Sequence, residues 1–266
     1  MDSTQRFSSR VENYVKHRPG YPEAAIARVV VWCRLEPHGT IADIGSGTGI
    51  SSEPFLRRGY VVHGVEPNLE MRQASLRILE QYPRFVGVDG TAENTTLGDR
   101  SVDLVIAAQA FHWFRRGEAR AEFQRILRPT GWVALLWNAR RTSSTPFLAA
   151  YEKLLREFAT DYSRVNHVDI PREEVQRFFQ PESYRLELFD NIQRFDFEGL
   201  RGRLLSSSYA PEAGHPSHEP MLRELVRIFE AHRDSRGQVA FEYDTEVHVG
   251  RLTKEWGQSP TECQKS

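Results

Sequence analysis

Three closely spaced glycines form the most specific chemical pattern in the sequence. Gly45, Gly47 and Gly49 directly follow a short apolar run, and glycine is the residue that lets backbone come close to a ligand. Loops that bind dinucleotides read GxGxxG, whereas this loop reads GxGxG, with Ile50 where the last glycine would stand. The spacing therefore disfavours a bound pyrophosphate.

Two carboxylates near this loop indicate what the ligand carries. Asp43 lies two positions before Gly45, where it would repel a pyrophosphate and attract a ligand ammonium group. It could equally order the loop. Glu66 ends the next β-branched run, roughly 20 residues after Gly45, where an acid can bind ribose hydroxyls. These residues predict a nucleoside with a free ribose and a cationic or zwitterionic end.

Further candidates follow the later apolar runs. His112 stands beside Trp113, and an imidazole can act as a general base near neutral pH. An aromatic wall around its ring is the alternative. Arg140 and Arg141 come after the fifth run, where guanidinium groups could hold a substrate carboxylate by paired hydrogen bonds. A solvated loop is the alternative for these two arginines.

The elements that must position these residues alternate through the first half of the chain, which is typical of a parallel α/β sheet. The expected strands are Thr40–Ile44, Tyr60–Val65, Arg84–Val88, Val102–Ala107 and Trp132–Trp137. The expected helices are Pro22–Leu35, Ser51–Arg58, Leu69–Gln81 and Gly117–Leu127. Pro54 predicts that the helix after the glycine loop starts late or bends. The candidate residues then meet at the carboxyl edge of the sheet.

The pattern changes after Asn138. The expected helices are Phe147–Ala159, Arg172–Phe179 and Met221–His232, and the expected long strands are Tyr184–Phe197 and Val239–Leu252. We predict an α/β fold with a Rossmann-like, seven-stranded, mostly parallel sheet, an antiparallel closing strand and an inserted helical cap. The sheet domain is assigned to residues 1–139 and 183–254, the cap to 140–182 and a flexible tail to 255–266.

Composition narrows the classes of partner. The chain of 266 residues has 35 Lys and Arg against 36 Asp and Glu, a net charge of −1. This balance gives no basic footprint for nucleic acid or an anionic membrane, and no apolar run is long enough to span a bilayer. Two cysteines, together with His215 and His218, show no metal-ligand spacing. We expect a cytoplasmic protein without metal, and the sequence does not indicate an oligomeric state.

Four motifs together resemble the class I S-adenosylmethionine-dependent methyltransferases over about Tyr14–Asn138. The motifs are the glycine loop, Val65-Glu66-Pro67-Asn68 with Met71, Gly90-Thr91-Ala92-Glu93, and Ala108-Gln109-Ala110-Phe111-His112-Trp113-Phe114. The resemblance is nearest to the small-molecule branch, methyltransferase type 11, which includes trans-aconitate methyltransferase-like proteins. It implies S-adenosyl-L-methionine as the cofactor.

The resemblance also implies a role for each matching residue. The three glycines, with Asp43, would line the methionine part of the cofactor, and Glu66 would hold its ribose. Asn68 and Met71 would flank the adenine, and Thr91, Ala92 and Glu93 would meet its edge. Ala108 and Gln109 are further candidates for binding the cofactor. Many relatives have Asp where this chain has Thr91, so the contact to the adenine amino group could come from backbone or Asp89.

The segment Tyr14–Pro22 resembles one that closes over the cofactor, with Tyr14 and Arg18 as binding residues and Arg18 pairing with the cofactor carboxylate. Trp113 and Asn138, with the two arginines, would line the acceptor site. The predicted function is a methyltransferase acting on a small molecule with a carboxyl or hydroxyl acceptor. The alternatives are a non-catalytic cofactor-binding or interaction module and an NAD-type oxidoreductase, which Ile50 and Asp43 disfavour.

Overall fold

The computed structural model describes residues 17–253 except 161, 163–171 and 208. Its centre is a seven-stranded sheet in the order β3-β2-β1-β4-β5-β7-β6. The strands are β1 Thr40–Ile44, β2 Val61–Val65, β3 Phe85–Val88, β4 Val102–Ala108, β5 Leu127–Arg140, β6 Tyr184–Phe195 and β7 Val239–Gly250. Neighbouring strands are parallel from β3 to β5, and β7 pairs antiparallel with both β5 and β6. The predicted Rossmann-like sheet with an antiparallel closing strand is confirmed.

The described helices follow the predicted order with two additions, a short 3-10 turn and one α-helix. They are α2 Glu23–Trp32, α3 Glu53–Leu56, α4 Leu69–Ile78, the 3-10 turn η3 Phe111–Trp113, α5 Arg116–Ile126, α6 Pro146–Phe158, α8 Arg172–Phe179, α9 Phe197–Leu205 and α10 His218–His232. Helix α3 starts late, with Pro54 in its first turn, as predicted. Helix α9 was not predicted, because Gly199 and Gly202 lower its helix propensity. No described helix is long and apolar enough to cross a membrane.

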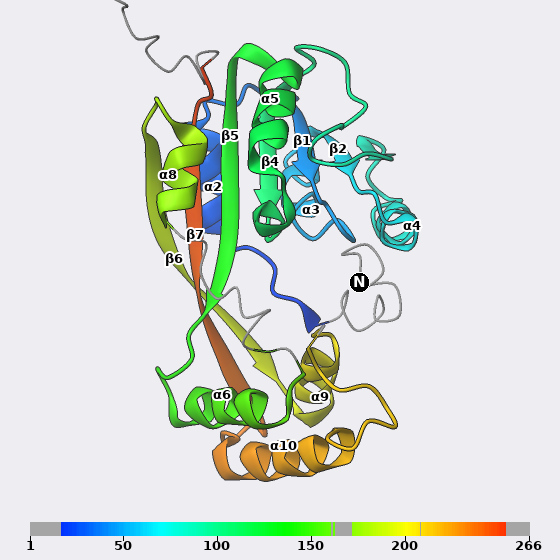
Figure 1. Cartoon of the computed structure of the whole chain (residues 1–266), viewed down its shortest axis with the longest axis vertical. Coiled ribbons are helices and arrows are strands. Elements are labelled where there is room, and N and C mark those ends of the chain that lie inside the picture. The colour runs from blue at the N-terminus through cyan, green and yellow to red at the C-terminus, as the bar shows by residue number, and fades with distance from the viewer. Residues whose placement is uncertain (1–16, 161, 163–171, 208, 254–266) are drawn as a thin grey trace, which may run out of the picture.

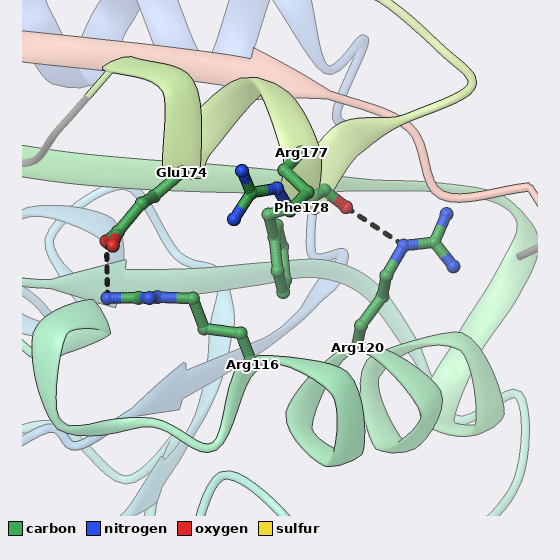
Figure 2. A pocket seen from close by; sticks show the side chains of 5 residues that line it. All are labelled: Arg116, Arg120, Glu174, Arg177 and Phe178. Atoms are coloured by element: carbon green, nitrogen blue, oxygen red, sulfur yellow. Dashed lines mark hydrogen bonds and ion pairs between the residues drawn. The ribbon is translucent and has the colours of Figure 1, made fainter.

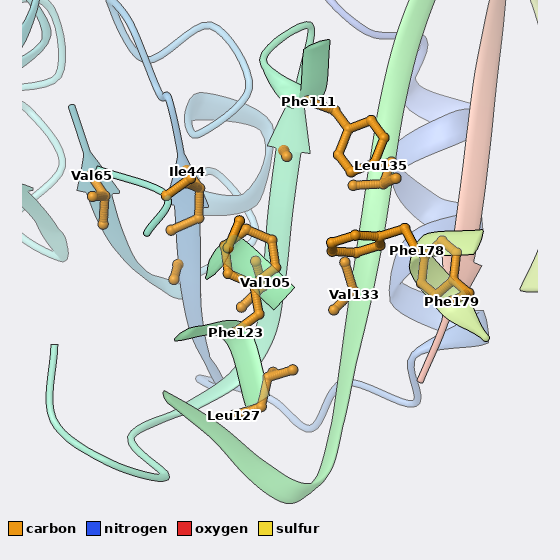
Figure 3. Packing of buried hydrophobic residues seen from close by; sticks show 14 of the residues in the cluster. Ile44, Val65, Val105, Phe111, Phe123, Leu127, Val133, Leu135, Phe178 and Phe179 are labelled. Carbon is orange, nitrogen blue, oxygen red and sulfur yellow. The ribbon is translucent and has the colours of Figure 1, made fainter. Parts of the chain in front are cut away.

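Apolar helix faces cover both sides of the sheet. On one side, α5 and α8 pack their aromatic residues against β4 and β5, and Figure 3 shows Phe178 and Phe179 beside Val133 and Leu135 of β5. On the other side, α2 and α3 contribute the buried residues of a second cluster. Full burial of a Phe side chain contributes roughly 1.5–3 kcal/mol. The sheet edge that carries the glycine loop is therefore held by a rigid core.

The three strands at the other side of the sheet are much longer than β1 to β3. Figure 1 shows that β6 and β7 extend beyond the shorter strands of the sheet and reach α6, α9 and α10. These helices and the strand ends share an aromatic core that includes Tyr151, Phe195 and Phe241, and we call this part the helical unit. Residues 140–182, predicted as one cap, supply α6 to the helical unit and α8 to the face of the sheet.

Candidate active site

The glycine loop joins the end of β1 to α3, and its three glycines differ in their surroundings. All three have positive φ angles, 68° at Gly45, 56° at Gly47 and 88° at Gly49. A Cβ at Gly45 would lie 2.7 Å from Ala110 Cβ, and one at Gly49 would lie 2.5 Å from Leu79 Cδ1. A Cβ at Gly47 would meet nothing within 4 Å. Gly45 and Gly49 thus allow close packing, whereas Gly47 has open space for a ligand.

Asp43 is fully buried at the end of β1. Its Oδ2 accepts hydrogen bonds from Ser51 Oγ at 2.7 Å and Ser52 Oγ at 2.6 Å, while its Oδ1 has no hydrogen-bond partner among the described residues. Burial raises the pKa of Asp43 to about 6, although the two serine hydroxyls lower it. One oxygen therefore orders the loop, and the other can accept a hydrogen bond from a ligand.

Glu66 is fixed at the end of β2 by two backbone amides. Its Oε2 accepts from Gly47 N and its Oε1 accepts from Asn68 N, both at 2.9 Å. Burial raises the pKa of this carboxyl, and the two amides oppose the shift. Each oxygen keeps a further lone pair, because a carboxylate offers about four acceptor positions. Glu66 is thus preorganised beside the glycine loop, with acceptor capacity left for hydroxyl groups.

The residues expected at the adenine make contacts within their own loops. Asn68 Oδ1 accepts from Met71 N at 2.9 Å and caps α4, where Met71 is buried. Thr91 Oγ1 accepts from Asn94 N at 3.2 Å, and Glu93 Oε1 accepts from Arg115 N at 2.8 Å, where α5 begins. These bonds, with buried Ala92, shape the loop after β3. Their contact with an adenine stays a prediction.

The ends of β4 and β5 are tied together through Gln109 and Asn138. Gln109, which follows Ala108 at the end of β4, has a φ of 59°, and its Nε2 donates to Asn138 O at 3.2 Å. Asn138 Nδ2 donates to Gly20 O at 3.2 Å, and its Oδ1 accepts from Asn191 and Thr245. The side chain of Asn138 therefore positions the N-terminal segment across the sheet edge.

That segment also contacts the helical unit. Arg18 Nη2 donates to Ser206 O at 3.0 Å, just after α9. A Cβ at Gly202 would lie 2.2 Å from His17 Nε2, so only glycine allows this approach. Tyr14 lies outside the described residues. The predicted pairing of Arg18 with a cofactor carboxylate stays a prediction, and the segment links both parts of the molecule.

His112 lies in the 3-10 turn after β4, surrounded by aromatic rings. Its ring is 4.6 Å from that of Trp113 and 5.1 Å, edge-to-face, from that of Trp137. Trp113 is 41% exposed and so is available to an incoming molecule. The aromatic wall considered for His112 is present, and its role as a general base stays a prediction.

The two arginines at the end of β5 have different surroundings. Arg140 has 9% of its side chain exposed and donates to Glu152 Oε2 at 2.6 Å. Arg141 is 34% exposed and pairs with Asp190 and Asp244, each at 2.5 Å. Two carboxylates thus balance the charge of Arg141, and we leave it out of the acceptor site. Arg140 keeps a buried Nη1 without a described partner.

The sequence analysis did not single out Arg203, a buried arginine of α9. It is 6% exposed, and its Nη1 donates to Ser207 Oγ at 3.2 Å. Its neighbours Tyr151 and Phe241 come from α6 and β7. No local spacing connects these residues. The local sequence provides little signal, because Arg203 follows Glu198 and Arg201 in a stretch of mixed apolar and charged residues.

A separate cleft of about 290 Å³ lies between α5 and α8, lined by Arg116, Arg120, Glu174, Arg177 and Phe178. Figure 2 shows Arg116 paired with Glu174 and Arg120 pointing to the backbone of α8. Arg120 Nε donates to Phe178 O at 2.9 Å, and Arg116 lies 2.5 Å from Glu174. These contacts anchor α8 to α5. The cleft lies on these two helices and contains none of the predicted site residues.

The part of the chain with the glycine loop and Glu66 has known counterparts. Residues 42–135 match a family model described as a methyltransferase domain. A putative type II methyltransferase from Anaeromyxobacter dehalogenans has the same fold, with a TM-score of 0.64 and 23% identity over 88% of this chain and 97% of that one. Residues 42–135 are thus similar to a methyltransferase domain, and the chain shares the fold of that neighbour.

The curated relatives that match part of this chain are described as methyltransferases. An uncharacterized methyltransferase of Mycobacterium tuberculosis is 38% identical over 139 residues, 52% of this chain and 54% of the relative. An uncharacterized methyltransferase-like protein of Schizosaccharomyces pombe is 32% identical over 159 residues, 58% of this chain and 59% of the relative. The matches thus span little more than half the length of these relatives.

One similar structure contains the cofactor. The phosphoethanolamine N-methyltransferase 2 of Haemonchus contortus, in complex with S-adenosyl-L-methionine, has a TM-score of 0.56 and 13% identity. The match covers 95% of this chain and 59% of that one. At this identity the likeness concerns the fold, and the fit of a cofactor here depends on the residues described above.

Proposed function

We propose that this protein transfers a methyl group from S-adenosyl-L-methionine to a small-molecule acceptor. The observation that carries the proposal is the open position at Gly47, between the unpartnered Oδ1 of Asp43 and the fixed carboxylate of Glu66. A carboxylate suits the ammonium of the methionine part, bare backbone suits its close approach, and Glu66 suits the ribose diol. Ser46 Oγ and Thr48 Oγ1 are further buried atoms without described partners.

The cofactor supplies a methyl group already activated by its sulfonium. The residues of this chain then have to bind and orient the cofactor and the acceptor and to exclude water. Positioning alone can lower the barrier to a transfer considerably. The segment around Gly20 lies across the sheet edge and is held there by Asn138 and Asn191. We infer that it helps to enclose the reacting groups.

The acceptor decides whether a base is needed. A carboxylate acceptor is already a nucleophile, whereas a hydroxyl acceptor must lose a proton as the methyl group arrives. His112 is the first candidate for that proton, because it follows β4 and lies next to the exposed ring of Trp113. The aromatic contacts of His112 would fix its ring for this task.

Calorimetry with S-adenosylhomocysteine tests the proposal. We expect one-to-one binding, weakened at least tenfold by Gly47→Arg, which fills the open space, and by Glu66→Ala. Gly237→Arg is the matched control, since Gly237 also has a positive φ, 71°, and a Cβ there also meets nothing within 4 Å. Failure of the wild-type protein to bind, or equal binding of NADH, would overturn the proposal.

A labelled-methyl assay with a panel of small acids and alcohols separates an enzyme from a binding module. Transfer to any member of the panel supports an enzyme. Cofactor binding without transfer to any of them would favour the non-catalytic alternative, in which the helical unit contacts a partner.

A further inference from the structure

Two arginines are buried around the same tyrosines in the helical unit. Arg140 lies at the end of β5, and Arg203 lies on α9. Tyr151 and Tyr209 lie near both guanidinium groups. Arg140 also lies over the ring of Tyr151, 5.4 Å from its centre. We call these four residues the arginine–tyrosine cluster.

Among the described residues, the cluster carries more positive charge than its neighbours balance. Glu152 pairs with Arg140 and is the one acid that the described part of the chain pairs with either arginine. Arg203 forms no ion pair with any residue that the structure describes, and its side-chain hydrogen bonds go to the hydroxyls of Ser207 and Tyr243. A buried charge without a counter-charge is costly unless a ligand or partner compensates it. The cluster is therefore suited to an anion.

The unused polar atoms of the cluster are all donors. Arg203 Nε, Arg140 Nη1 and Tyr151 Oη are buried and have no hydrogen-bond partner among the described residues. Guanidinium groups only donate. Burial raises the pKa of Tyr151, so its hydroxyl stays protonated and can donate. An ionised carboxylate accepts and never donates, so it matches both the charge and the hydrogen bonds that the cluster offers, whereas an ammonium group matches neither.

The cluster is also within reach of the cofactor edge. Arg140 lies two residues beyond Asn138 on β5, so both point to the same face at a spacing of about 6.6 Å. The carbonyl of Asn138 binds Gln109 at the end of β4, beside the residues assigned to the cofactor. A small molecule anchored in the cluster can therefore extend to the reacting methyl group.

We propose that the methyl acceptor carries a carboxylate that Arg203, Arg140 and Tyr151 bind, while a second atom of the acceptor receives the methyl group. This rests on the proposed function of the same site. A lone pair of that second atom would form the new bond to the methyl carbon as the bond from carbon to sulfur breaks, with its electron pair left on the sulfur of the departing S-adenosylhomocysteine. If the second atom is a hydroxyl oxygen, its proton would pass to His112, whereas an oxygen of a second carboxylate has no proton to lose. No bond forms or breaks at the anchored carboxylate.

Acetate is the probe, because the smallest stable carboxylates enter the site whatever the shape of the true acceptor. With S-adenosylhomocysteine present and ionic strength held constant, acetate should raise the melting temperature of the wild-type protein, and the neutral acetamide should not. Arg203→Met should abolish the acetate shift and leave S-adenosylhomocysteine binding unchanged. No acetate shift in the wild-type protein, or an equal shift in Arg203→Met, would overturn the proposal.

A second measurement needs no ligand. Because methionine keeps the apolar stem without the charge, Arg203→Met should raise the melting temperature of the free protein by about 2–4 °C. Arg227→Met is the control, since Arg227 is 79% exposed and pairs with Glu224 on the same helix. A lower melting temperature for Arg203→Met would show that Arg203 stabilises the fold, and it would contradict the acceptor-binding role.

The two proposals fail separately. If S-adenosylhomocysteine does not bind, the cofactor assignment is wrong, whatever acetate does. If it binds and acetate has no effect, the proposed function stands and the carboxylate anchor is wrong.

Discussion

The edge with the glycine loop and the arginine–tyrosine cluster are both buried, and both hold polar atoms without described partners, but their charges are opposite. Asp43 and Glu66 make the first region acidic, whereas Arg140 and Arg203 make the second basic. One region suits a cationic ligand end and the other an anionic one. Each ligand can therefore be recognised separately, so a substitution in one region should affect the binding of one ligand.

The two regions also differ in how they are built. The first is largely backbone, with Gly47 N and Asn68 N fixing Glu66. The second consists of side chains from α6, α9 and β5, held by aromatic packing such as the 4.9 Å contact of Tyr151 and Phe241. Removing a charged group should therefore change the stability of the protein by different amounts in the two regions.

The largest effect is expected from Arg140→Met. This change removes the buried one of the two guanidinium partners of Glu152, since Arg156 is 73% exposed, and breaking a buried ion pair costs about 3–5 kcal/mol. Hydrogen bonds lower the pKa of Glu152 against the effect of burial, so the carboxylate stays charged at neutral pH. Urea unfolding measures the loss. A stability equal to that of wild type would show that the hydrogen bonds from Tyr162 and Arg156 are enough to stabilise the carboxylate of Glu152.

Asp43→Asn should separate binding from stability. We expect S-adenosylhomocysteine affinity to fall at least tenfold, because the ammonium loses its counter-charge, while the melting temperature stays equal or rises as a buried charge is removed. Calorimetry and thermal unfolding measure both. Asp99→Asn is the control, an exposed carboxylate paired with Arg125. Unchanged affinity in Asp43→Asn would restrict Asp43 to ordering the loop.

The pKa of Asp43, raised by burial to about 6, predicts a pH-dependent affinity. An ammonium ligand favours the ionised carboxylate, so cofactor affinity should rise as pH increases towards 6, by up to about tenfold per unit, and then level off. In the free protein the stabilising effect of the protonated carboxyl is full below about pH 4 and is lost as pH rises through 6. Calorimetry from pH 5 to 7.5 tests this, and Asp43→Asn should give a flatter profile.

The smallest effect is expected from Arg141→Gln. Its ion pairs with Asp190 and Asp244 are partly exposed, and such pairs contribute about 0–1 kcal/mol. The KM for a carboxylate-bearing acceptor should stay within twofold of the wild-type value, whereas Arg203→Met should raise it. An increased KM for Arg141→Gln would return Arg141 to the acceptor site.

Local patterns predicted most of the fold. The bounds of β1 to β4 differ from the expected ones by a residue or so, because apolar runs between turn residues are a local signal. The early start of β5 at Leu127 was not predicted, since Pro129 and Gly131 are turn residues. Nor was α9, for which the helix-lowering glycine at 202 is explained only by the approach of His17.

The two regions were predictable to different degrees, because the sequence signal comes from local patterns. Asp43, Gly47 and Glu66 follow consecutive strands, so their spacing alone brings them to one edge. The surroundings of Arg203 include Tyr151 and Phe241, which lie far away in the sequence and contact it only after folding. The exposed pairing of Arg141 and the buried pairing of Arg140 were likewise indistinguishable in two adjacent identical residues.

Strand β5 begins at the edge of the sheet opposite the glycine loop, passes the edge that carries the loop and continues into the helical unit. Asn138 and Arg140 lie on this one strand, so it would fix the distance between the proposed cofactor site and the proposed acceptor anchor. Selection would then depend on the length of the acceptor. Molecules with the right groups at the wrong separation would bind at one end and remain unmethylated.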